Sequence, residues 1–282
     1  MNIEKILPNE GPSIQEVKKY IEKYSNESIV IKCGGSVLLE KNLFDQFVED
    51  ISIVNKLGLS AIVVHGGGKN IKKKLNEKNI ESNFINGLRV TDKNTINIVE
   101  EALLELNFEI VDQIKNYQAN AVSVTPKNGN IIKVIPEKKE LGLVGYPSEI
   151  NKKKILEIIN NKKVPVILPM GVGEDRKIYN INADTAAGSV AQGLNSRRLL
   201  LMTDVEGVLD RNNKLITEIN SEVANNMLND GSISGGMIPK IKTCLDCINN
   251  GVTGVVIVDG RKPHSILFEL FSDKGAGTLI RK

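Results

Sequence analysis

The chain has 282 residues, a length that suits one large α/β domain or two closely packed lobes. Its formal net charge is only +3 and its aromatic content is 4% with no Trp, which argues against a nucleic-acid-binding surface. No apolar run approaches the roughly 20 residues of a membrane helix. Residues 1–10 carry acidic side chains without an apolar core, so we expect a cytoplasmic protein with no secretory signal and no membrane contact.

The N-terminal segment, residues 1–28, precedes the first core strand and contains one predicted helix. Ser13 follows Pro12, and Glu16 stands three residues later, so a capping box predicts a helix over Ser13–Tyr24. Packing within the same subunit and contact with another subunit are both open interpretations of this helix. Its apolar side carries Ile14, Val17, Tyr20, Ile21 and Tyr24.

Strands and helices alternate through the rest of the chain. Several strand candidates are near-continuous apolar runs, which are typical of a parallel sheet covered on both faces. Helices are predicted between them, for example over Asn94–Lys115 and Thr185–Leu194, so we predict an α/β sandwich around a mainly parallel sheet. Asn128-Gly129 predicts a hairpin between two short strands. The strand candidates are Ile29–Lys32, Ala61–Val64, Val122–Thr125, Ile131–Ile135, Val164–Leu168, Arg198–Met202 and Gly254–Val258.

The first predicted strand ends in a lysine followed by a glycine pair, Lys32-Cys33-Gly34-Gly35-Ser36. Open α/β sheets bind ligands at the carboxyl ends of their strands. Glycines let backbone N–H groups approach a phosphate closely, and a lysine there can neutralise phosphoryl charge. A purely structural tight turn is the alternative interpretation.

The second strand ends in a similar turn, His65-Gly66-Gly67-Gly68. Three consecutive glycines are entropically costly and bury nothing, so an anion bound at a helix N-terminus is the better explanation. Gly68-Lys69-Asn70 lacks the upstream glycine and the Ser or Thr of a P-loop. Neither this turn nor Gly171-Val172-Gly173 has the third glycine of a dinucleotide fingerprint. We interpret His65 as a turn residue and not as a catalytic base.

Three charged residues follow in polar or glycine-rich surroundings. Arg89, in Asn86-Gly87-Leu88-Arg89, could fork onto a carboxylate, with a surface salt bridge as the alternative. Asp184 precedes a helix of small residues and is a plausible N-cap for it. Lys240 lies in the first turn of a helix, where a cation opposes the helix dipole, so we expect a bound anion beside it.

The sequence offers few residues for a metal site or for a Ser/His/Asp catalytic triad. Cys244 and Cys247 form a lone C-x-x-C with no second pair of ligands nearby, and both continue an apolar helical stripe, so core packing is favoured. The chain has only two histidines and no candidate Ser/His/Asp triad, and we predict no protein-held metal. Two lysines, an aspartate and two glycine turns suit phosphoryl transfer, which relies on positioning and charge.

The chain resembles the amino-acid kinase family from about Ile29 to Ile280. The strings IKCGGS, VVHGGG, NGLRVTD, YNINADTAA, LMTDVEGVLD and GGMIPK occur in the family's order. The resemblance implies a three-layer αβα sandwich of the carbamate-kinase type. It assigns substrate binding and dimerisation to an N-terminal lobe, residues 29–175, and ATP binding to a C-terminal lobe, residues 176–282.

The resemblance also implies a reaction. ATP would phosphorylate the γ-carboxylate of N-acetyl-L-glutamate, the second step of the acetylated route to arginine, with Mg²⁺ carried by the nucleotide. Alternatives are a family phosphotransferase for carbamate or aspartate, and a non-catalytic sensor of nucleotide or arginine. By resemblance, Lys32 and Lys240 stabilise the transition state, Asp184 orients them, Gly67, Gly68, Arg89 and Asn180 hold the substrate, and Gly34, Gly35, Thr203, Asp204 and Gly207 bind the nucleotide.

Regulation is implied by the same resemblance. The helix over Ser13–Tyr24 is similar to the extra helix of arginine-inhibited family members, which interlaces dimers into a hexamer. Tyr20 and the stretch Phe271–Thr278 stand where an arginine effector would bind. One departure lies at Val124–Gly129, which replaces a glycine-lysine-aspartate-glycine turn and puts the local loop structure in question.

Overall fold

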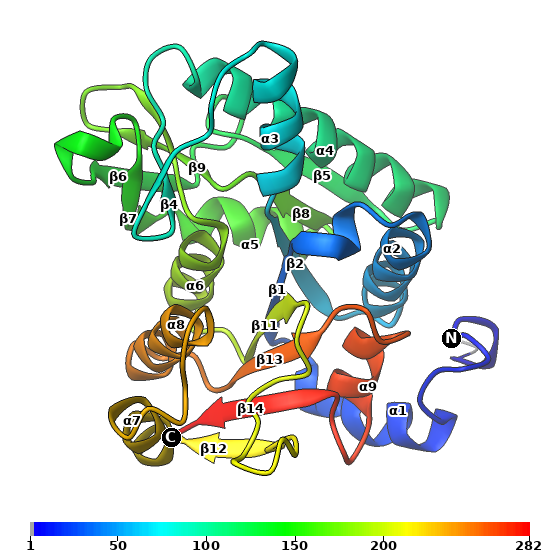
Figure 1. Cartoon of the computed structure of the whole chain (residues 1–282). Helices are drawn as coiled ribbons and strands as arrows, with labels where there is room; N and C mark the ends of the chain where they lie inside the picture. The colour runs from blue at the N-terminus through cyan, green and yellow to red at the C-terminus, as the bar shows by residue number, and fades with distance from the viewer. Residues whose placement is uncertain (1–2) are drawn as a thin grey trace.

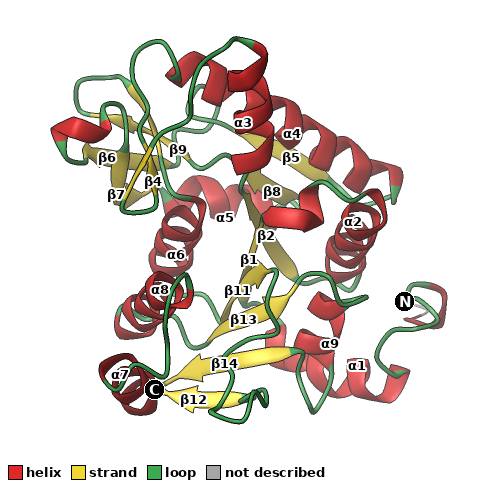
Figure 2. Ribbon diagram, viewed as in Figure 1, coloured by secondary structure: helices red, strands yellow, loops and turns green. Residues whose placement is uncertain are grey.

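A computed structural model describes residues 3–282. Across these residues the strands form one eight-stranded sheet, one four-stranded sheet and one two-stranded hairpin (Figures 1 and 2). The large sheet has the order β12 (Glu218–Asn220), β14 (Gly277–Arg281), β13 (Val255–Asp259), β11 (Arg198–Thr203), β1 (Ser28–Cys33), β2 (Ser60–His65), β8 (Val164–Ile167) and β5 (Ala121–Val124). The four-stranded sheet has the order β10 (Ile178–Asn180), β9 (Met170–Gly173), β6 (Ile132–Pro136) and β7 (Gly145–Ile150), and the hairpin joins β3 (Phe84–Ile85) to β4 (Leu88–Arg89).

The large sheet is mainly parallel, as predicted. Only β13 and β14 pair antiparallel among its neighbouring strands. Lys32 on β1 stands level with Leu201 on β11 and Val64 on β2. The carboxyl ends of these central strands therefore meet at one edge, where the glycine turns follow.

Helices cover both faces of the large sheet and complete the three layers (Figures 1 and 2). One face is covered by α1 (Ile14–Ile21), α2 (Lys41–Lys56), α4 (Ile96–Asn116) and α9 (Ser265–Phe271). The other is covered by α5 (Lys152–Asn160), α6 (Ala183–Leu194), α7 (Ser221–Asn229) and α8 (Met237–Asn249). The short α3 (Gly68–Glu77) packs against α4. The described 3₁₀ turns are Ile3–Lys5, Glu22–Tyr24, Gly35–Leu38 and Lys139–Leu141.

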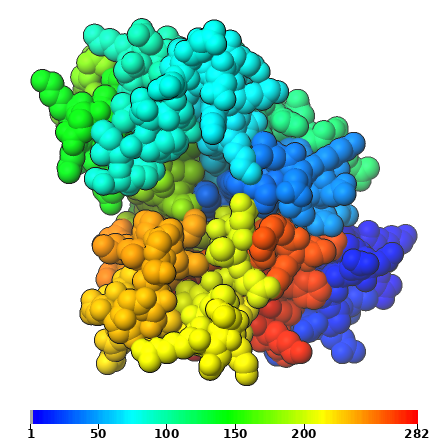
Figure 3. All heavy atoms as spheres, viewed as in Figure 1, coloured from blue at the N-terminus to red at the C-terminus, as the bar shows by residue number. Residues whose placement is uncertain are grey.

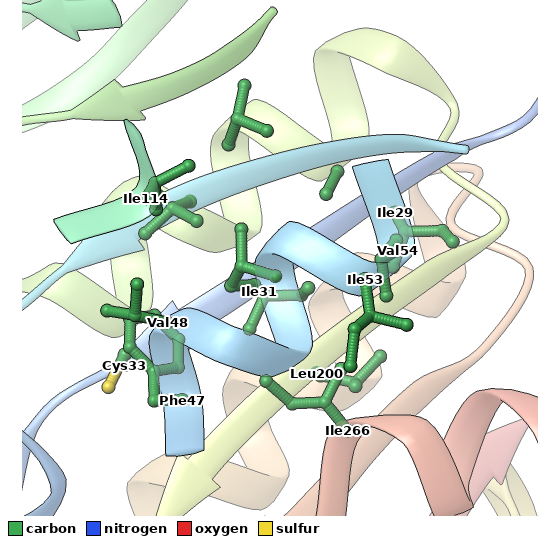
Figure 4. Close-up of a cluster of buried hydrophobic side chains, with 14 of the residues drawn as sticks. Ile29, Ile31, Cys33, Phe47, Val48, Ile53, Val54, Ile114, Leu200 and Ile266 are labelled. Carbon is green, nitrogen blue, oxygen red and sulfur yellow. The ribbon is translucent and has the colours of Figure 1, made fainter. Parts of the chain in front are cut away.

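The strand alternation explains why the sheet needs both layers. Ile29, Ile31 and Cys33 on β1 enter the core beneath α2, whereas Val30 enters the core on the opposite face. Figure 4 shows the first core, where side chains of β1 meet Phe47 of α2. Each fully buried aliphatic side chain contributes about 1.5–3 kcal/mol, so this core fixes β1 and the turn that leaves it.

The predicted hairpin at Asn128-Gly129 is wrong. β5 pairs with β8 in the large sheet, whereas β6 pairs with β7 and β9 in the small one. Neither Asn128 nor Gly129 adopts the positive φ of a two-residue hairpin turn; the positive φ belongs to Asn130. The Asn128 side chain instead accepts a hydrogen bond from the Thr125 N–H (2.7 Å), so the segment is a connection between sheets.

The N-terminal helix is confirmed as α1, continued by the 3₁₀ turn Glu22–Tyr24. Ser13 Oγ accepts from the Glu16 N–H, and the Glu16 carboxylate accepts from the Ser13 N–H, which is the predicted capping box. Val17 and Tyr24 are buried in the core of the same chain. Packing within one subunit is therefore confirmed, and contact with another subunit stays a prediction. No helix within residues 3–282 is long and apolar enough to cross a bilayer.

Candidate active site

The two glycine turns lie side by side at the carboxyl edge of the sheet. The Gly66 N–H donates to the Cys33 carbonyl oxygen (2.7 Å), which ties the second turn to the first. A Cβ on Gly34 would lie 2.9 Å from Lys32 Nζ, so the lysine side chain reaches past this glycine. Gly35 has φ +67°, a conformation that favours glycine. Lys32 therefore lies beside the first glycine turn, as the sequence indicated, and the second turn is tied to the first.

A buried carboxylate links the two predicted lysines. Lys32 Nζ lies 2.8 Å from Asp184 Oδ1, and Lys240 Nζ lies 2.9 Å from Asp184 Oδ2. The two lysine side chains are 12% and 20% exposed. The structure thus brings together residues from β1, α6 and α8 that are up to 208 positions apart (240 − 32).

The prediction that Asp184 is the N-cap of its helix is wrong. The N-cap is Asn182, whose Oδ1 accepts from the Asp184 N–H (2.9 Å) and the Thr185 N–H (3.1 Å). Both residue types cap helices well, so spacing alone does not separate them. Because Asn182 satisfies the orphan N–H groups, the Asp184 carboxylate is left to bind the lysines.

The cluster is electropositive. Burial acts to raise the pKa of Asp184, but the ammonium groups of Lys32 and Lys240 outweigh it and hold that pKa at about 2. The carboxylate is therefore ionised at neutral pH, and two ammonium groups with one carboxylate leave one net positive charge. Asp184 gives Lys240 a carboxylate partner in its unfavourable helix position, and the bound anion expected beside Lys240 stays a prediction.

A cavity of about 220 Å³ opens beside this cluster. It adjoins the cluster through Lys32, while Asp184 and Lys240 stand behind that lysine. In Figure 3 the molecule is hollowed between its cyan-to-green part and its yellow-to-orange part. Seven of the predicted site residues line the cavity together: Lys32, Gly34, Gly35, Gly67, Gly68, Arg89 and Asn180.

Arg89, on β4, also lines this cavity. Its guanidinium stacks on Phe84 (4.6 Å to the ring centroid) and donates through Nη2 to the Gly68 carbonyl oxygen (3.0 Å); Nη1 also bonds Ser82 Oγ. Burial lowers the pKa of Arg89, and no carboxylate within residues 3–282 pairs with it. The surface salt bridge considered from sequence is therefore wrong. A buried guanidinium without a carboxylate partner favours an anionic ligand.

Asn180, on β10, faces the same space from the small sheet. Its Nδ2 donates to Thr91 Oγ1 (3.2 Å), and Thr91 Oγ1 donates in turn to the Arg89 carbonyl oxygen (3.0 Å). Thr91 is fully buried and was not singled out from sequence, although it stands in the NGLRVTD string. This chain of bonds fixes Asn180 relative to the strand that carries Arg89.

The predicted nucleotide residues at the end of β11 connect to the first glycine turn. Asp204 Oδ1 accepts from Ser36 Oγ (2.7 Å), and a Cβ on Gly35 would lie 2.9 Å from the same oxygen. Ser36 was missed from sequence, although it follows the glycine pair directly. Gly207 is explained by packing, because its Cβ would lie 2.5 Å from Thr278 Oγ1. Thr203, Asp204 and Gly207 do not line the 220 Å³ cavity.

The two cysteines of α8 and His65 were also interpreted from the sequence. Cys244 and Cys247 are buried in α8, and burial raises the pKa of Cys247 to about 12, so core packing is confirmed. His65 is not a turn residue. It is the last residue of β2 and is fully buried.

Comparison with known proteins places this geometry in a family. The Amino acid kinase family model matches residues 27–259. The chain belongs to the amino acid kinase family. An acetylglutamate kinase of Pelagibacter ubique is 59% identical over 277 residues, covering 98% of this chain and 96% of the relative. An acetylglutamate kinase of Campylobacter fetus is 42% identical over 264 residues, covering 93% and 94%. The protein is therefore a kinase of this family.

Solved structures with a similar backbone support the same fold for this chain. N-acetylglutamate synthase from Neisseria gonorrhoeae superposes with a TM-score of 0.85 at 20% identity, over 95% of this chain and 62% of that chain. Carbamate kinase from Giardia lamblia superposes with a TM-score of 0.69 at 17% identity, over 91% and 98%. These likenesses confirm the predicted carbamate-kinase-like α/β fold.

Proposed function

We propose that the protein transfers the terminal phosphoryl group of ATP to the γ-carboxylate of N-acetyl-L-glutamate. The products are N-acetyl-L-glutamyl 5-phosphate and ADP, the second step of the acetylated route to arginine. The observation that carries the proposal is the near full-length, 59% identity to an acetylglutamate kinase. The lysine cluster beside an Arg89-lined cavity supplies the chemistry that such a transfer needs.

The chemical step moves one phosphoryl group between two oxygens. A γ-carboxylate oxygen forms a bond to the terminal phosphorus, and the bond to the bridging oxygen breaks, leaving its electron pair on ADP. Lys32 and Lys240 stabilise the charge on the moving group, and their preorganised positions remove the need for reorganisation. Asp184 holds both ammonium groups in place through the 2.8 Å and 2.9 Å contacts.

The substrate binds in the 220 Å³ cavity. Arg89 pairs with its α-carboxylate, and Asn180 and the backbone of Gly67 and Gly68 hold the rest. The ATP phosphates lie along Gly34 and Gly35, and the remaining nucleotide lies toward Thr203, Asp204 and Gly207. In this proposal residues 29–175 form the substrate lobe and residues 176–282 the nucleotide lobe, while Asn180 reaches the substrate and Gly34 and Gly35 reach the phosphates from the opposite lobes.

Mg²⁺ enters with ATP and has no resident protein site in this proposal. Both Asp184 oxygens face ammonium groups, and the described part of the chain contains no group of three His, Cys, Asp or Glu side chains placed to hold a metal. Mg²⁺ keeps water and phosphate ligands readily, so the nucleotide itself can carry it. The bound ion would neutralise charge on the β- and γ-phosphates.

We further propose that arginine binds a second cavity, of about 180 Å³, between α1 and the end of α9. Glu269 lines it as a partly buried carboxylate that could pair with a guanidinium, and Lys23 and Lys274 could receive a carboxylate. Tyr20 closes one side through its hydroxyl bond to Asp273 (2.5 Å). We also propose that α1 joins dimers into a hexamer. We expect the protein to lie in the cytoplasm.

A substrate panel tests the reaction. ADP release should depend on N-acetyl-L-glutamate and be weak with carbamate or aspartate. Strong activity on either of those acids, with none on N-acetyl-L-glutamate, would identify another family phosphotransferase. ATP binding without transfer to any acid would identify a sensor instead.

A further inference from the structure

A buried hydrogen-bonded chain lies directly behind the second glycine turn. His65 Nδ1 is 2.8 Å from the Gly66 carbonyl oxygen, and His65 Nε2 is 3.0 Å from Asn107 Nδ2. The same Asn107 nitrogen is 2.9 Å from the Val166 carbonyl oxygen on β8. His65 and Asn107 are fully buried, and neither lines the cavity. The hydrogen bond from His65 reaches Gly66, which does line the cavity.

The bond to Val166 determines where each proton lies. A backbone carbonyl can only accept, so the Asn107 atom facing Val166 must be the NH₂ group. The same NH₂ group then donates to His65 Nε2, which must be unprotonated. A neutral imidazole with unprotonated Nε2 carries its proton on Nδ1, which can donate to the Gly66 carbonyl. Burial lowers the pKa of His65 to about 4, which keeps the ring neutral near pH 7.

The bond to Gly66 orients the next peptide group. The Gly66–Gly67 peptide is trans, so its C=O and N–H point in opposite directions. The Gly66 N–H is held by the Cys33 carbonyl (2.7 Å), and the Gly66 carbonyl is held by His65. The Gly67 N–H is thereby directed away from His65, and it has no hydrogen-bond acceptor within residues 3–282. Gly67 itself lines the cavity.

We propose that His65 and Asn107 are positioning residues for phosphoryl transfer. Asn107 selects the Nδ1–H tautomer of His65, and His65 fixes the Gly66–Gly67 peptide with the Gly67 N–H facing the cavity. There the N–H group donates to an anionic oxygen of the acceptor or of the moving phosphoryl group. The inference rests on the proposed function only for the identity of that oxygen.

The tautomer can be measured without any substrate. The chain has only two histidines, so ¹⁵N-labelled histidine gives two pairs of ring-nitrogen signals, and a His65→Gln variant identifies the pair that belongs to His65. The expected result for His65 near pH 7 is a protonated Nδ1 and an unprotonated Nε2. An Nε2–H tautomer, or a charged ring, would overturn the proposal whatever acid the kinase phosphorylates.

Steady-state kinetics test whether Asn107 and His65 affect phosphoryl transfer. Asn107→Leu removes both donated bonds, so kcat should fall at least tenfold while KM for ATP changes less than threefold. Ile110→Val, buried on the same helix, is the control for lost stability and should keep kcat. If Asn107→Leu keeps the kcat of the control, the positioning role is wrong. If Asn107→Leu does not fold, the tautomer measurement on the wild-type chain still decides the proposal.

Discussion

Asp184 sits between two lysines in a largely buried position, and each of the three charges depends on the others. The 2.8 Å and 2.9 Å contacts compensate the carboxylate for its lost hydration. Removing one lysine leaves the other two charges in place but lowers the net charge of the cluster from +1 to zero. In the proposed reaction we therefore expect the loss of a lysine to affect the rate more than substrate binding.

Replacing either lysine should lower turnover. Lys240→Ala should reduce kcat by about 100-fold or more, since a preorganised charge stabiliser is worth about 3 kcal/mol. The measurement is steady-state ADP release at saturating substrates. Lys242→Ala, an exposed lysine two residues along α8, is the control and should retain wild-type kcat. Near-normal turnover of Lys240→Ala would contradict the assigned role.

The same carboxylate should make stability depend on acid pH. Its pKa falls from the ordinary 3.8 to about 2 on folding. The stabilisation, about 2–3 kcal/mol, is therefore fully present above about pH 4 and is lost as the pH falls through 2. Urea unfolding gives the free energy of unfolding of wild type and of Asp184→Asn. The gap between these two free energies should narrow from pH 6 to pH 2.5. A gap that stays constant over this range would contradict the pKa.

At the scale of single elements, the glycine turns were predictable because each follows a continuous apolar strand. The strand and the turn are both local signals, and the parallel sheet then brings the turns together. The Asn128-Gly129 hairpin failed because its two flanking strands found partners elsewhere in the sheets. Turn propensity carries no information on such long-range pairing.

The polar interior of the site was only partly predictable. Asn182 and Asp184 are equally good caps by type, so their roles could not be separated from the sequence. Arg89 is buried because a hairpin and α3 enclose it, which is a tertiary effect. Asn107 did leave a signal, since it is a polar residue within the apolar stripe Leu103, Leu106 and Ile110 of α4.

The first glycine turn offers a test of geometry at this scale. Gly35→Ala places a Cβ 2.9 Å from Asp204 Oδ1 at φ +67°, so it should lower stability by about 1 kcal/mol and also raise KM for ATP. Gly58→Ala is the matched control, with φ +84° and open space around its Cβ. It should show a similar loss of stability by thermal unfolding with unchanged KM. Equal KM values for the two variants would contradict a nucleotide role for this turn.

At the scale of the whole molecule, the site joins distant parts of one sheet. β1 supplies Lys32, while α6 and α8, on the opposite face from α2, supply Asp184 and Lys240 (Figure 1). The 180 Å³ cavity lies elsewhere, between α1 and the end of α9. An effector bound there would have to act through the sheet and its helices.

Deleting residues 1–25 should reduce both the size of the assembly and the response to arginine. The deletion removes α1 together with Tyr20, which bonds Asp273 beside the proposed effector cavity. Analytical ultracentrifugation measures the first effect, and inhibition of ADP release by arginine measures the second. Asp273→Asn is a milder variant that keeps α1 and should weaken only the arginine response. An unchanged assembly after the deletion would contradict the joining role of α1.

The formation of an acyl phosphate is the most direct consequence of the whole account. Hydroxylamine converts an acyl phosphate to a hydroxamate, so the product on the γ-carboxylate can be trapped and identified by mass. With ATP, Mg²⁺ and N-acetyl-L-glutamate, we predict one γ-hydroxamate for each ADP released. ADP release without hydroxamate, or hydroxamate formed equally well from aspartate, would contradict the proposed reaction.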